Sequence, residues 1–253
     1  MKYIAFDSST KAMTVALAEG NIDSQEPLAI RASTTTLGKR QHGQILAPAI
    51  DTILTQADWQ MSEIDGIIVG IGPGSYTGLR IGVTFAKVWG HSKGLDVYTV
   101  SSLALMAQAA AVDSDYIIPL MDARRGTAYL GLYRYQDDQL VALQADQHQA
   151  FYSWLAELAP TIPAGSTVTL VGVGIEDFVG QAHDQLKDVH VKVVSDFKAY
   201  PQADAAFNMA PKRLVEDMAT LAPNYAHETL AEREWLEKTQ ADKPEAADLI
   251  DFK

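Results

Sequence analysis

The sequence contains no cysteine, and this absence excludes several kinds of chemistry at once. A chain without cysteine forms no disulfide, carries no thiol nucleophile and builds no thiolate metal site. The six histidines include no pair at the H-x-x-x-H or H-E-x-x-H spacing that places two imidazoles on one helix face. The sequence therefore predicts no metal site and no metal-dependent or thiol-dependent catalysis.

Long hydrophobic runs and excess positive charge are absent as well. No apolar run approaches the roughly 18 residues of a membrane-spanning helix, and Asp7 interrupts the N-terminus before a secretory core forms. The formal net charge is −12, so most of the surface repels a nucleic acid. These features predict a soluble cytoplasmic protein without membrane contact, and any RNA substrate would need a basic partner to hold it.

Enough apolar material is present for a substantial core. Hydrophobic residues make up 47% of the 253 residues, which is typical of a folded globular protein and too high for a disordered one. At this length the chain forms either one large domain or two lobes of about 100–150 residues each.

The densest run of small residues is VGIGPGSYTGLRIGVTFAK, at 69–87, where a short apolar run leads into a helix. The spacing of its glycines fits neither a Walker loop nor the dinucleotide fingerprint, which needs G-x-G-x-x-G. Ser75 lacks the flanking glycines of a nucleophile elbow and has no evident base. Two interpretations stay open, a turn whose N–H groups meet an anion, and a tight turn with Ser75 or Thr77 capping the helix.

The first hundred residues alternate between strand-like and helix-like patterns. They predict the order β-β-β-α-β-α-β-α. The predicted strands lie at 3–7, 13–19, 28–34, 65–72 and 96–100, and the predicted helices lie at 43–57, from the glycine loop to about 89, and at 101–111. The opening meander predicts a mixed sheet rather than an all-parallel one.

The second half repeats this order. The predicted strands lie at 116–122, 127–136, 140–144, 167–174 and 189–194, with helices at 150–159 and 175–186. Asp7 and Asp122 each end the first strand of their half, and the runs VGIG at 69–72 and VGVG at 171–174 each end the fourth. The chain is therefore predicted to be a duplicated α/β unit, with two lobes facing each other across a cleft.

The predicted boundaries follow from this repeat. The first lobe spans 1–104, the second spans 105–202, and two helical stretches within 203–240 complete the first lobe. The remaining 241–253 are charged and lack a periodic apolar face, so we expect a loose acidic tail.

A duplicated β-β-β-α-β-α-β unit with an aspartate at the first strand of each lobe resembles the actin, Hsp70 and sugar-kinase (ASKHA, ribonuclease H-like) superfamily. Within it, five segments together closely resemble the TsaB (YeaZ) family over nearly the whole chain. These segments are IAFDSST, GIGPGSYTGLRIGVTFAKVWG, VSSLALMA, PLMDARRGTAYLGLY and PNYAHETLAEREWLEK.

The resemblance implies a role in the threonylcarbamoylation of adenosine 37 in tRNAs that read codons beginning with A. In such a system TsaC makes threonylcarbamoyl-AMP, TsaD transfers the group with a metal held by an H-x-x-x-H pair, and the ATPase TsaE joins the complex. A TsaB-like chain is then a subunit that binds TsaD, forms a homodimer in its absence, and meets tRNA only through the complex. The resemblance implies no catalytic residue in this chain.

The resemblance also identifies degenerate phosphate positions. Nucleotide-binding relatives carry glycine after the first aspartate, whereas here Asp7 is followed by Ser8, Ser9 and Thr10, and Asp122 by Ala123, Arg124 and Arg125. Hydroxyl groups or an arginine could still contact a phosphate. The alternative is that Asp7 accepts local backbone N–H bonds at a strand end. We expect no cofactor in the isolated chain, with ATP or ADP at the interface of the complex.

A small-residue ridge carries the partner prediction. Gly78, Gly82, Ala86 and Gly90 recur every four residues, and such a ridge lets another helix approach closely. The expected contact joins this helix and the 42–54 helix to the equivalent pair of TsaD or of a second copy. The alternative is packing against the lobe's own sheet. The predicted interface residues are His42, Leu46, Ser75, Gly78, Leu79, Arg80, Gly82, Val83 and Ala86.

Two other functions compete with this one. An actin-fold phosphotransferase or ATPase acting on a small molecule needs an intact phosphate hairpin. A peptidase, suggested by an old "glycoprotease" label of the family, needs an activated nucleophile or a metal. The sequence shows neither of these requirements in full, so the non-catalytic subunit is the leading hypothesis.

Overall fold

The computed structural model describes residues 1–226 except 25, 39–41, 111–113, 138 and 209–211, and it contains two mixed β-sheets. The first sheet has the order β11-β5-β4-β1-β2-β3, and the second has the order β10-β9-β6-β7-β8. The strands of the first sheet are β1 (Lys2–Asp7), β2 (Ala12–Glu19), β3 (Ala29–Leu37), β4 (Gly66–Gly70), β5 (Asp96–Val100) and β11 (Arg213–Leu214). Those of the second are β6 (Tyr116–Asp122), β7 (Thr127–Gln136), β8 (Gln139–Ala150), β9 (Thr167–Val171) and β10 (His190–Val194).

The two sheets share one topology. In the first, β1 pairs antiparallel with β2 and parallel with β4, and in the second, β6 pairs antiparallel with β7 and parallel with β9. Without β11, the strand orders of the two sheets coincide element by element. The prediction of a duplicated β-β-β-α-β-α-β unit with mixed sheets, and with it the α/β, actin-like fold class, is confirmed.

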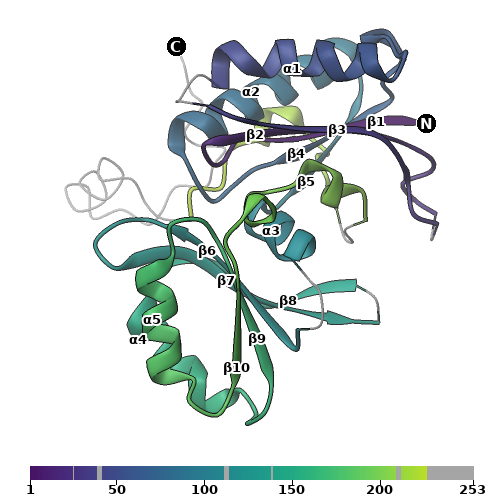
Figure 1. Ribbon diagram of the computed structural model, residues 1–253. Helices are drawn as coiled ribbons and strands as arrows, with labels where there is room; N and C mark the ends of the chain where they lie inside the picture. The colour runs from purple at the N-terminus through teal and green to yellow at the C-terminus, as the bar shows by residue number, and fades with distance from the viewer. Residues whose placement is uncertain (25, 39–41, 111–113, 138, 209–211, 227–253) are drawn as a thin grey trace.

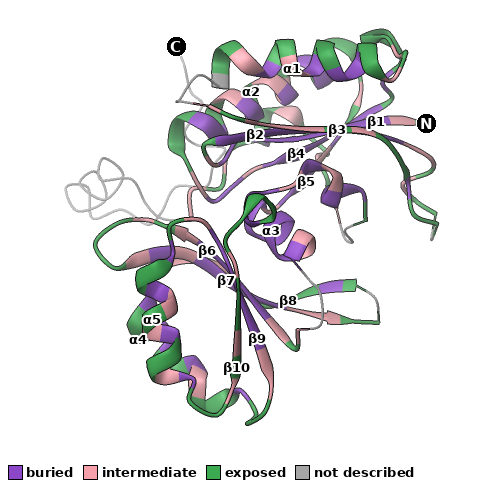
Figure 2. Cartoon of the chain, in the orientation of Figure 1, coloured by how far each residue is buried: buried purple, intermediate pink, exposed green. Residues whose placement is uncertain are grey.

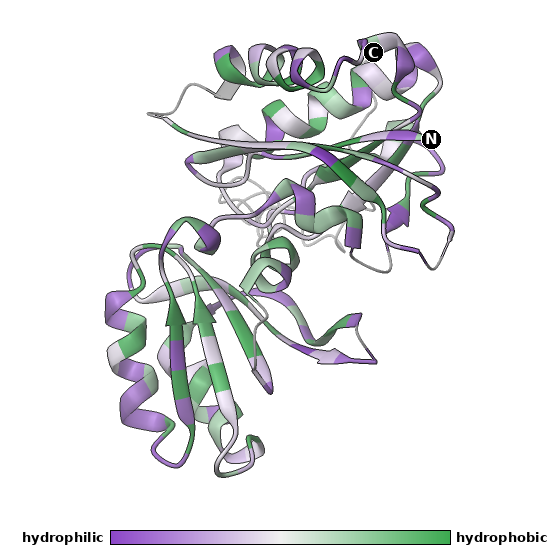
Figure 3. Cartoon of the chain, turned by 45° about the vertical axis from the view of Figure 1, so that its right-hand side comes forward, coloured by the Kyte–Doolittle hydropathy of each residue, from purple (hydrophilic) through white to green (hydrophobic). Residues whose placement is uncertain are grey.

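The helices cover the sheets in layers. They are α1 (His42–Gln56), α2 (Tyr76–Lys93), α3 (Ser102–Ala110), α4 (Phe151–Leu158) and α5 (Glu176–Gln185). Figure 1 shows α1 and α2 on the outer face of the first sheet, α4 and α5 on the outer face of the second, and α3 between the two sheets. Figure 3 shows both hydrophilic and hydrophobic residues along the outer helices, and many hydrophobic residues in the strands. Among the described helices, none combines the length and the apolar character that crossing a bilayer requires.

Helix α3 lies in a core that both lobes build. Seven of its nine residues are buried, and Figure 2 shows it almost wholly in the buried colour. Its cluster joins Tyr3 and Ile68 of the first sheet to Ile117 and Val171 of the second. Two further clusters lie under the outer helices, one beneath α1 and α2 and one beneath α4 and α5. The two lobes are therefore packed through a shared apolar layer.

The C-terminal region differs from the prediction of two helices within 203–240. A short 3-10 helix spans Ala203–Asn208, strand β11 pairs antiparallel with β5, and a 3-10 turn follows at Met218–Thr220. The prediction of an α-helix over 203–219 is wrong because these backbone groups bond elsewhere: the Val215 N–H donates to the Val97 carbonyl at 2.8 Å. The second predicted helix and the 241–253 tail lie outside the described residues.

Strand β8 is longer than the predicted 140–144 and carries an irregularity. Its register against β7 shifts between Leu132, which faces Gln144, and Leu130, which faces Gln147. Two residues of β8, Ala145 and Asp146, therefore lie opposite the single residue Gly131. Such a bulge re-aims side chains, and here it places Asp146 against β7 and the start of α3.

Candidate functional site

The aspartate at the end of β1 is buried and fully engaged within the chain. Asp7 is 1% exposed, and its Oδ1 accepts the Ser9 N–H at 2.8 Å and the Ser9 hydroxyl at 2.6 Å. Its Oδ2 accepts the Ser102 hydroxyl at 2.6 Å, and the Ser102 Oγ in turn accepts the Gly72 N–H at 3.0 Å. The interpretation of Asp7 as a strand-end acceptor of local backbone bonds is confirmed, and this carboxylate holds the turn after β1 and the glycine loop together.

Ser8 points to the opposite side, into the packing of α2. Its hydroxyl donates to the Gly78 carbonyl at 2.8 Å, and the side chain is 1% exposed. Neither Asp7 nor Ser8 lines the cavity between the lobes. Their assignment as phosphate positions is corrected, because both side chains are committed to bonds that hold the turn and the helix.

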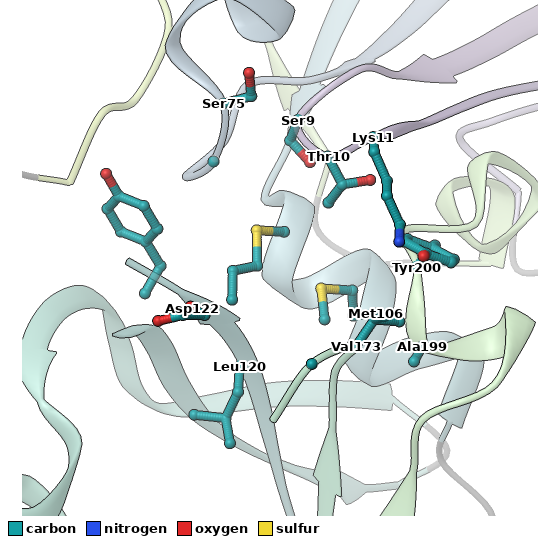
Figure 4. Close-up of a pocket in the computed structure, with 14 residues that line it drawn as sticks. Ser9, Thr10, Lys11, Ser75, Met106, Leu120, Asp122, Val173, Ala199 and Tyr200 are labelled. Atoms are coloured by element: carbon teal, nitrogen blue, oxygen red, sulfur yellow. The ribbon is translucent and has the colours of Figure 1, made fainter. Parts of the chain in front are cut away.

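A cavity of about 460 Å³ lies between the lobes where the first strands of both sheets end. Figure 4 shows Ser9, Thr10 and Lys11 on one side and Asp122 with Leu120 on the other. Its lining residues are Ser9, Thr10, Lys11, Gly74, Ser75, Met106, Leu120, Met121, Asp122, Tyr129, Val173, Gly174, Ala199 and Tyr200. The sequence-predicted positions Ser9, Thr10 and Asp122 therefore do meet at one cavity.

The polar groups around this cavity are mostly used by the chain itself. The Ser9 N–H bonds Asp7, the Thr10 hydroxyl accepts the Ala12 N–H at 3.1 Å, and Asp122 accepts the Arg124 N–H at 2.8 Å. The Lys11 ammonium lies 5.7 Å from the centre of the Tyr200 ring. A phosphate site needs several free N–H groups converging on one point, and the first hairpin here directs its Ser9 N–H inward. In the described part of the chain, no group of three or more His, Asp or Glu side chains could hold a metal.

The glycine loop between β4 and α2 owes its composition to close contacts. Gly72 has φ +112°, and a Cβ there would lie 2.4 Å from the Asn224 carbonyl oxygen. Gly74 has φ +154°, and a Cβ there would lie 2.4 Å from the Ser9 carbonyl oxygen. Both positions require glycine on conformational and steric grounds. The loop is thus pressed between the β1–β2 turn and the returning C-terminal segment.

The helix after this loop begins with a side-chain cap. Ser75 is the N-cap of α2, and its Oγ accepts the Gly78 N–H at 3.3 Å. Its own N–H donates to the Ser9 carbonyl at 2.6 Å. Of the two interpretations of the loop, the capped tight turn is confirmed for Ser75.

The small-residue ridge of α2 faces the chain's own sheet, so its prediction as a partner surface is wrong. A Cβ on Gly82 would lie 2.4 Å from the Ser8 hydroxyl oxygen, and one on Gly90 would lie 2.5 Å from the Val97 side chain. The buried members of the predicted interface are Leu46, Gly78, Leu79, Gly82, Val83 and Ala86. The ridge does provide a close approach, as predicted, but the elements that approach it are the turn after β1 and strand β5.

The remaining predicted interface residues lie at the surface or at a helix start. Ser75 and Arg80 are exposed, and His42 is the first residue of α1. The Arg80 Nε donates to the Tyr225 hydroxyl at 3.1 Å, and its guanidinium lies 4.2 Å from the Tyr76 ring centre. Tyr76 and Tyr225 stack at 4.8 Å. This exposed cluster attaches the last described residues of the chain to the first turn of α2.

Sequence reasoning missed several residues that organise this region. Ser102 completes the Asp7 network, and Asn224 donates its N–H to the Ile71 carbonyl at 2.7 Å beside the glycine loop. Asp146 accepts hydroxyl bonds from Ser101 and Tyr133. The serine pair at 101–102, where α3 begins, was the one available signal, because serine favours the start of a helix. The other contacts join positions far apart in the chain.

Comparison with known proteins gives consistent matches. The family model "TsaD: tRNA N6-adenosine threonylcarbamoyltransferase" matches residues 32–248. The "tRNA threonylcarbamoyladenosine biosynthesis protein TsaB" of Bacillus subtilis (strain 168) is 30% identical over 241 residues, which cover 94% of this chain and 99% of that protein. The protein of the same name from Escherichia coli (strain K12) is 31% identical over 137 residues, covering 53% of this chain and 55% of that protein.

A solved structure agrees with the fold. "YeaZ from Pseudomonas aeruginosa" superimposes with a TM-score of 0.67 at 21% identity, covering 88% of this chain and 99% of that one. At this level of identity the likeness shows that the fold is shared.

Proposed function

The chain belongs to the TsaB family of tRNA threonylcarbamoyladenosine biosynthesis proteins, and on this premise we propose how it takes part: it is a non-catalytic subunit that binds TsaD and supports the modification of adenosine 37. The observation that carries the proposal is the 30% identity to a TsaB protein along 94% of this chain and 99% of that protein. The inward bonding of Asp7 supports it, because a phosphotransferase of this fold needs that hairpin for nucleotide phosphates.

The outer faces of α1 and α2 are the proposed TsaD surface. Both helices bury one side in the first sheet, and no other described element covers their opposite side. Val88 on α2 is 63% exposed, an unusual position for a large aliphatic side chain, and Ala47 and Pro48 on α1 are exposed as well. The sequence predicted the same two helices as the partner surface but assigned the contact to the faces that are buried. The proposed contact uses their exposed faces instead. A stable contact here needs about 800 Å² from each partner.

Val88→Asp tests this surface. Placing a charge in the centre of an apolar contact leaves it desolvated and unpaired, so we expect at least about tenfold weaker binding to TsaD. Affinity is measured by co-purification and by titration calorimetry with purified TsaD. Val193→Asp is the matched control, because Val193 is 41% exposed on β10 of the other lobe. Unchanged TsaD affinity of a folded Val88→Asp variant, or an equal loss for both variants, contradicts the surface.

Reconstitution tests the role itself. Purified chain is combined with tRNA and threonylcarbamoyl-AMP, with and without TsaD and TsaE, and modified adenosine is quantified by mass spectrometry. We expect product only when TsaD is present, and sustained turnover only when TsaE is added. Multiple turnovers by this chain alone would show that it is itself the transferase.

The same proposal extends to the other subunits, the nucleotide and the cellular compartment. TsaE joins the complex, tRNA contacts the partner subunits, and without TsaD the chain pairs with a second copy through the same helix faces. ATP or ADP binds where the subunits meet, and the protein acts in the cytoplasm, where tRNA is modified. Melting temperatures measured with and without ATP–Mg²⁺ test the position of the nucleotide. ATP–Mg²⁺ should raise the melting temperature of the complex and leave that of the isolated chain unchanged.

A further inference from the structure

A second cavity, of about 340 Å³, lies beside the start of α3, away from the phosphate positions. Its lining residues are Ile71, Gly72, Thr99, Val100, Ser101, Ala104, Tyr133, Leu140, Ala142, Ala145, Asp146, Arg213 and Asn224. They come from the end of β5, the first turn of α3, the glycine loop, the β7–β8 hairpin and the C-terminal segment. The volume is in the range of small-molecule sites, which often lie between the lobes of a protein.

Asp146 is the acidic group of this cavity. The β8 bulge aims it at the start of α3, where its two oxygens accept the hydroxyl protons of Ser101 and Tyr133. Ser101 is fixed in turn, because its Oγ accepts the Ala104 N–H at 3.0 Å. A carboxylate offers about four acceptor positions, so both oxygens can accept further protons from a ligand. Burial raises the pKa of Asp146, although both hydroxyl bonds act to lower it, and a cationic partner would relieve that cost.

Arg213 supplies the opposite charge. It lies on β11, opposite Thr99 of β5, and its side chain is exposed and reaches both this cavity and the neighbouring one. Asp146 and Arg213 are the two charged side chains among the lining residues, and they form no ion pair with each other in the described structure. The cavity therefore presents separated charges of opposite sign.

Much of the rest of the lining is apolar. Ile71, Val100, Ala104, Leu140 and Ala142 form this apolar wall, from four different segments of the chain. Apolar walls with a few placed polar groups are the usual composition of a small-molecule site. An aliphatic group is the ligand part that such a wall accommodates.

We propose that this cavity binds a small zwitterion of the α-amino acid class, with its ammonium on Asp146, its carboxylate on Arg213 and an aliphatic side chain against the apolar wall. A simple cation would be attracted by Asp146 but repelled by Arg213. A simple anion would be attracted by Arg213 but repelled by Asp146. A ligand carrying both charges satisfies both residues. This inference stands apart from the proposed function, and neither depends on the other.

Titration calorimetry on the full chain tests the ligand class. L-leucine is the first probe, followed by the other protein amino acids. Two analogues each remove one charge: isopentylamine lacks the carboxylate, and 4-methylpentanoate lacks the ammonium. Because each charge-assisted hydrogen bond contributes strongly, we expect each analogue to bind at least about tenfold more weakly than leucine.

Two variants test the site. Asp146→Asn and Arg213→Gln should each weaken binding of the amino acid by about tenfold or more. The matched controls are Asp184→Asn on the exposed side of α5 and Arg31→Gln on β3, both of which should bind as the unchanged chain does. Circular dichroism checks that each variant is folded. If Asp146→Asn alters folding, Arg213→Gln still tests the site, because Arg213 is exposed.

The binding measurements on the analogues and the variants either support or overturn the amino-acid site. Binding of leucine or another aliphatic amino acid that both variants weaken and both controls retain supports the proposal. No binding by any of the amino acids overturns it, as does equal binding of isopentylamine or of 4-methylpentanoate. Binding that survives Arg213→Gln unchanged places the ligand elsewhere and also overturns it.

Discussion

At the scale of single residues, the contact between Gly82 and Ser8 decides how closely α2 packs on β1. The Ser8 hydroxyl donates to the Gly78 carbonyl and occupies the place where a Gly82 Cβ would stand, at 2.4 Å. Interior glycine ordinarily costs a helix about 1 kcal/mol relative to alanine. Here the glycine is retained because the larger residue would displace a buried hydrogen bond.

A double-mutant cycle measures this contact. Gly82→Ala should destabilise the protein by roughly 1–3 kcal/mol, because overpacking costs more than the gain in helix propensity. Ser8→Ala removes the clashing oxygen, so the double variant should be more stable than the sum of the two single changes predicts. Urea unfolding gives the free energies. Simple additivity would show that α2 shifts freely and that Ser8 is not the obstacle.

Burial raises the pKa of Asp146 above its ordinary value of 3.8. The folded chain then binds this proton more tightly than the unfolded chain does. The resulting stability is fully present below the ordinary pKa and is lost as pH rises through the raised one. Asparagine does not titrate. The free energy of unfolding of the unchanged chain, relative to that of Asp146→Asn, should therefore fall as pH rises through this window.

Urea unfolding of both chains at a series of pH values from about 4 to about 8 checks the sign. Subtracting the two curves removes the titrations that the chains share. A difference that stays constant, or one that grows as pH rises, contradicts the assignment of a raised pKa to Asp146.

At the scale of elements, the start of α2 depends on one hydroxyl. The Ser75 Oγ accepts the Gly78 N–H at 3.3 Å, and the helix carries no acidic residue in its first turn to stabilise its other N–H groups. Ser75→Ala should cost about 1 kcal/mol of stability. Ser92→Ala, in the last turn of the same helix, is the control and should change stability by less than about 0.5 kcal/mol. Equal losses would mean that the N-cap contributes nothing specific.

Elements were predictable from sequence wherever local pattern and tertiary environment agreed. Strand β4 is a continuous apolar run and helix α1 carries a clear helical periodicity, and each begins within a residue of its predicted start. The far half of β8 was not predictable, because QADQHQA is polar and resembles a loop. Pairing with the long strand β7 makes it a strand and introduces the bulge that places Asp146. The second cavity could not be foreseen from the sequence for the same reason.

The face of a helix was harder to predict than its existence. The ridge Gly78–Gly82–Ala86 predicted a close approach, and a close approach is present. Its partner could have been another helix or the chain's own sheet, and spacing alone does not distinguish them. The bond from Ser8 to the Gly78 carbonyl, across a long separation in sequence, decides for the sheet.

At the scale of the whole molecule, the duplication was readable because both lobes keep the same markers. Asp7 and Asp122 end equivalent strands, and the two strand orders coincide. Their surroundings have diverged: Asp7 is buried and bonded by serines, whereas Asp122 is exposed at the cavity. The fold therefore could be predicted from one chain, and the state of its ancestral ligand positions could not.

The net charge of −12 gives a whole-molecule prediction for RNA. Phosphate contacts supply most of the affinity of non-specific nucleic-acid binding, and a strongly acidic surface opposes them. The isolated chain should bind tRNA with a dissociation constant above about 10 μM at physiological salt. Filter binding with and without TsaD checks this. Tight binding by the chain alone that weakens steeply with salt would assign the RNA contact to this subunit.

The position of α3 between the sheets has a consequence for how the molecule comes apart. Its buried side chains complete the apolar layer of both lobes, so neither lobe retains a finished core once the other has melted. The repeat that duplicated the architecture has therefore not produced two independently folding units. Heating should give one calorimetric transition whose van't Hoff enthalpy equals its calorimetric enthalpy. Two resolved heat-absorption peaks would mean that each lobe is a separate cooperative unit, joined by α3 but not dependent on it.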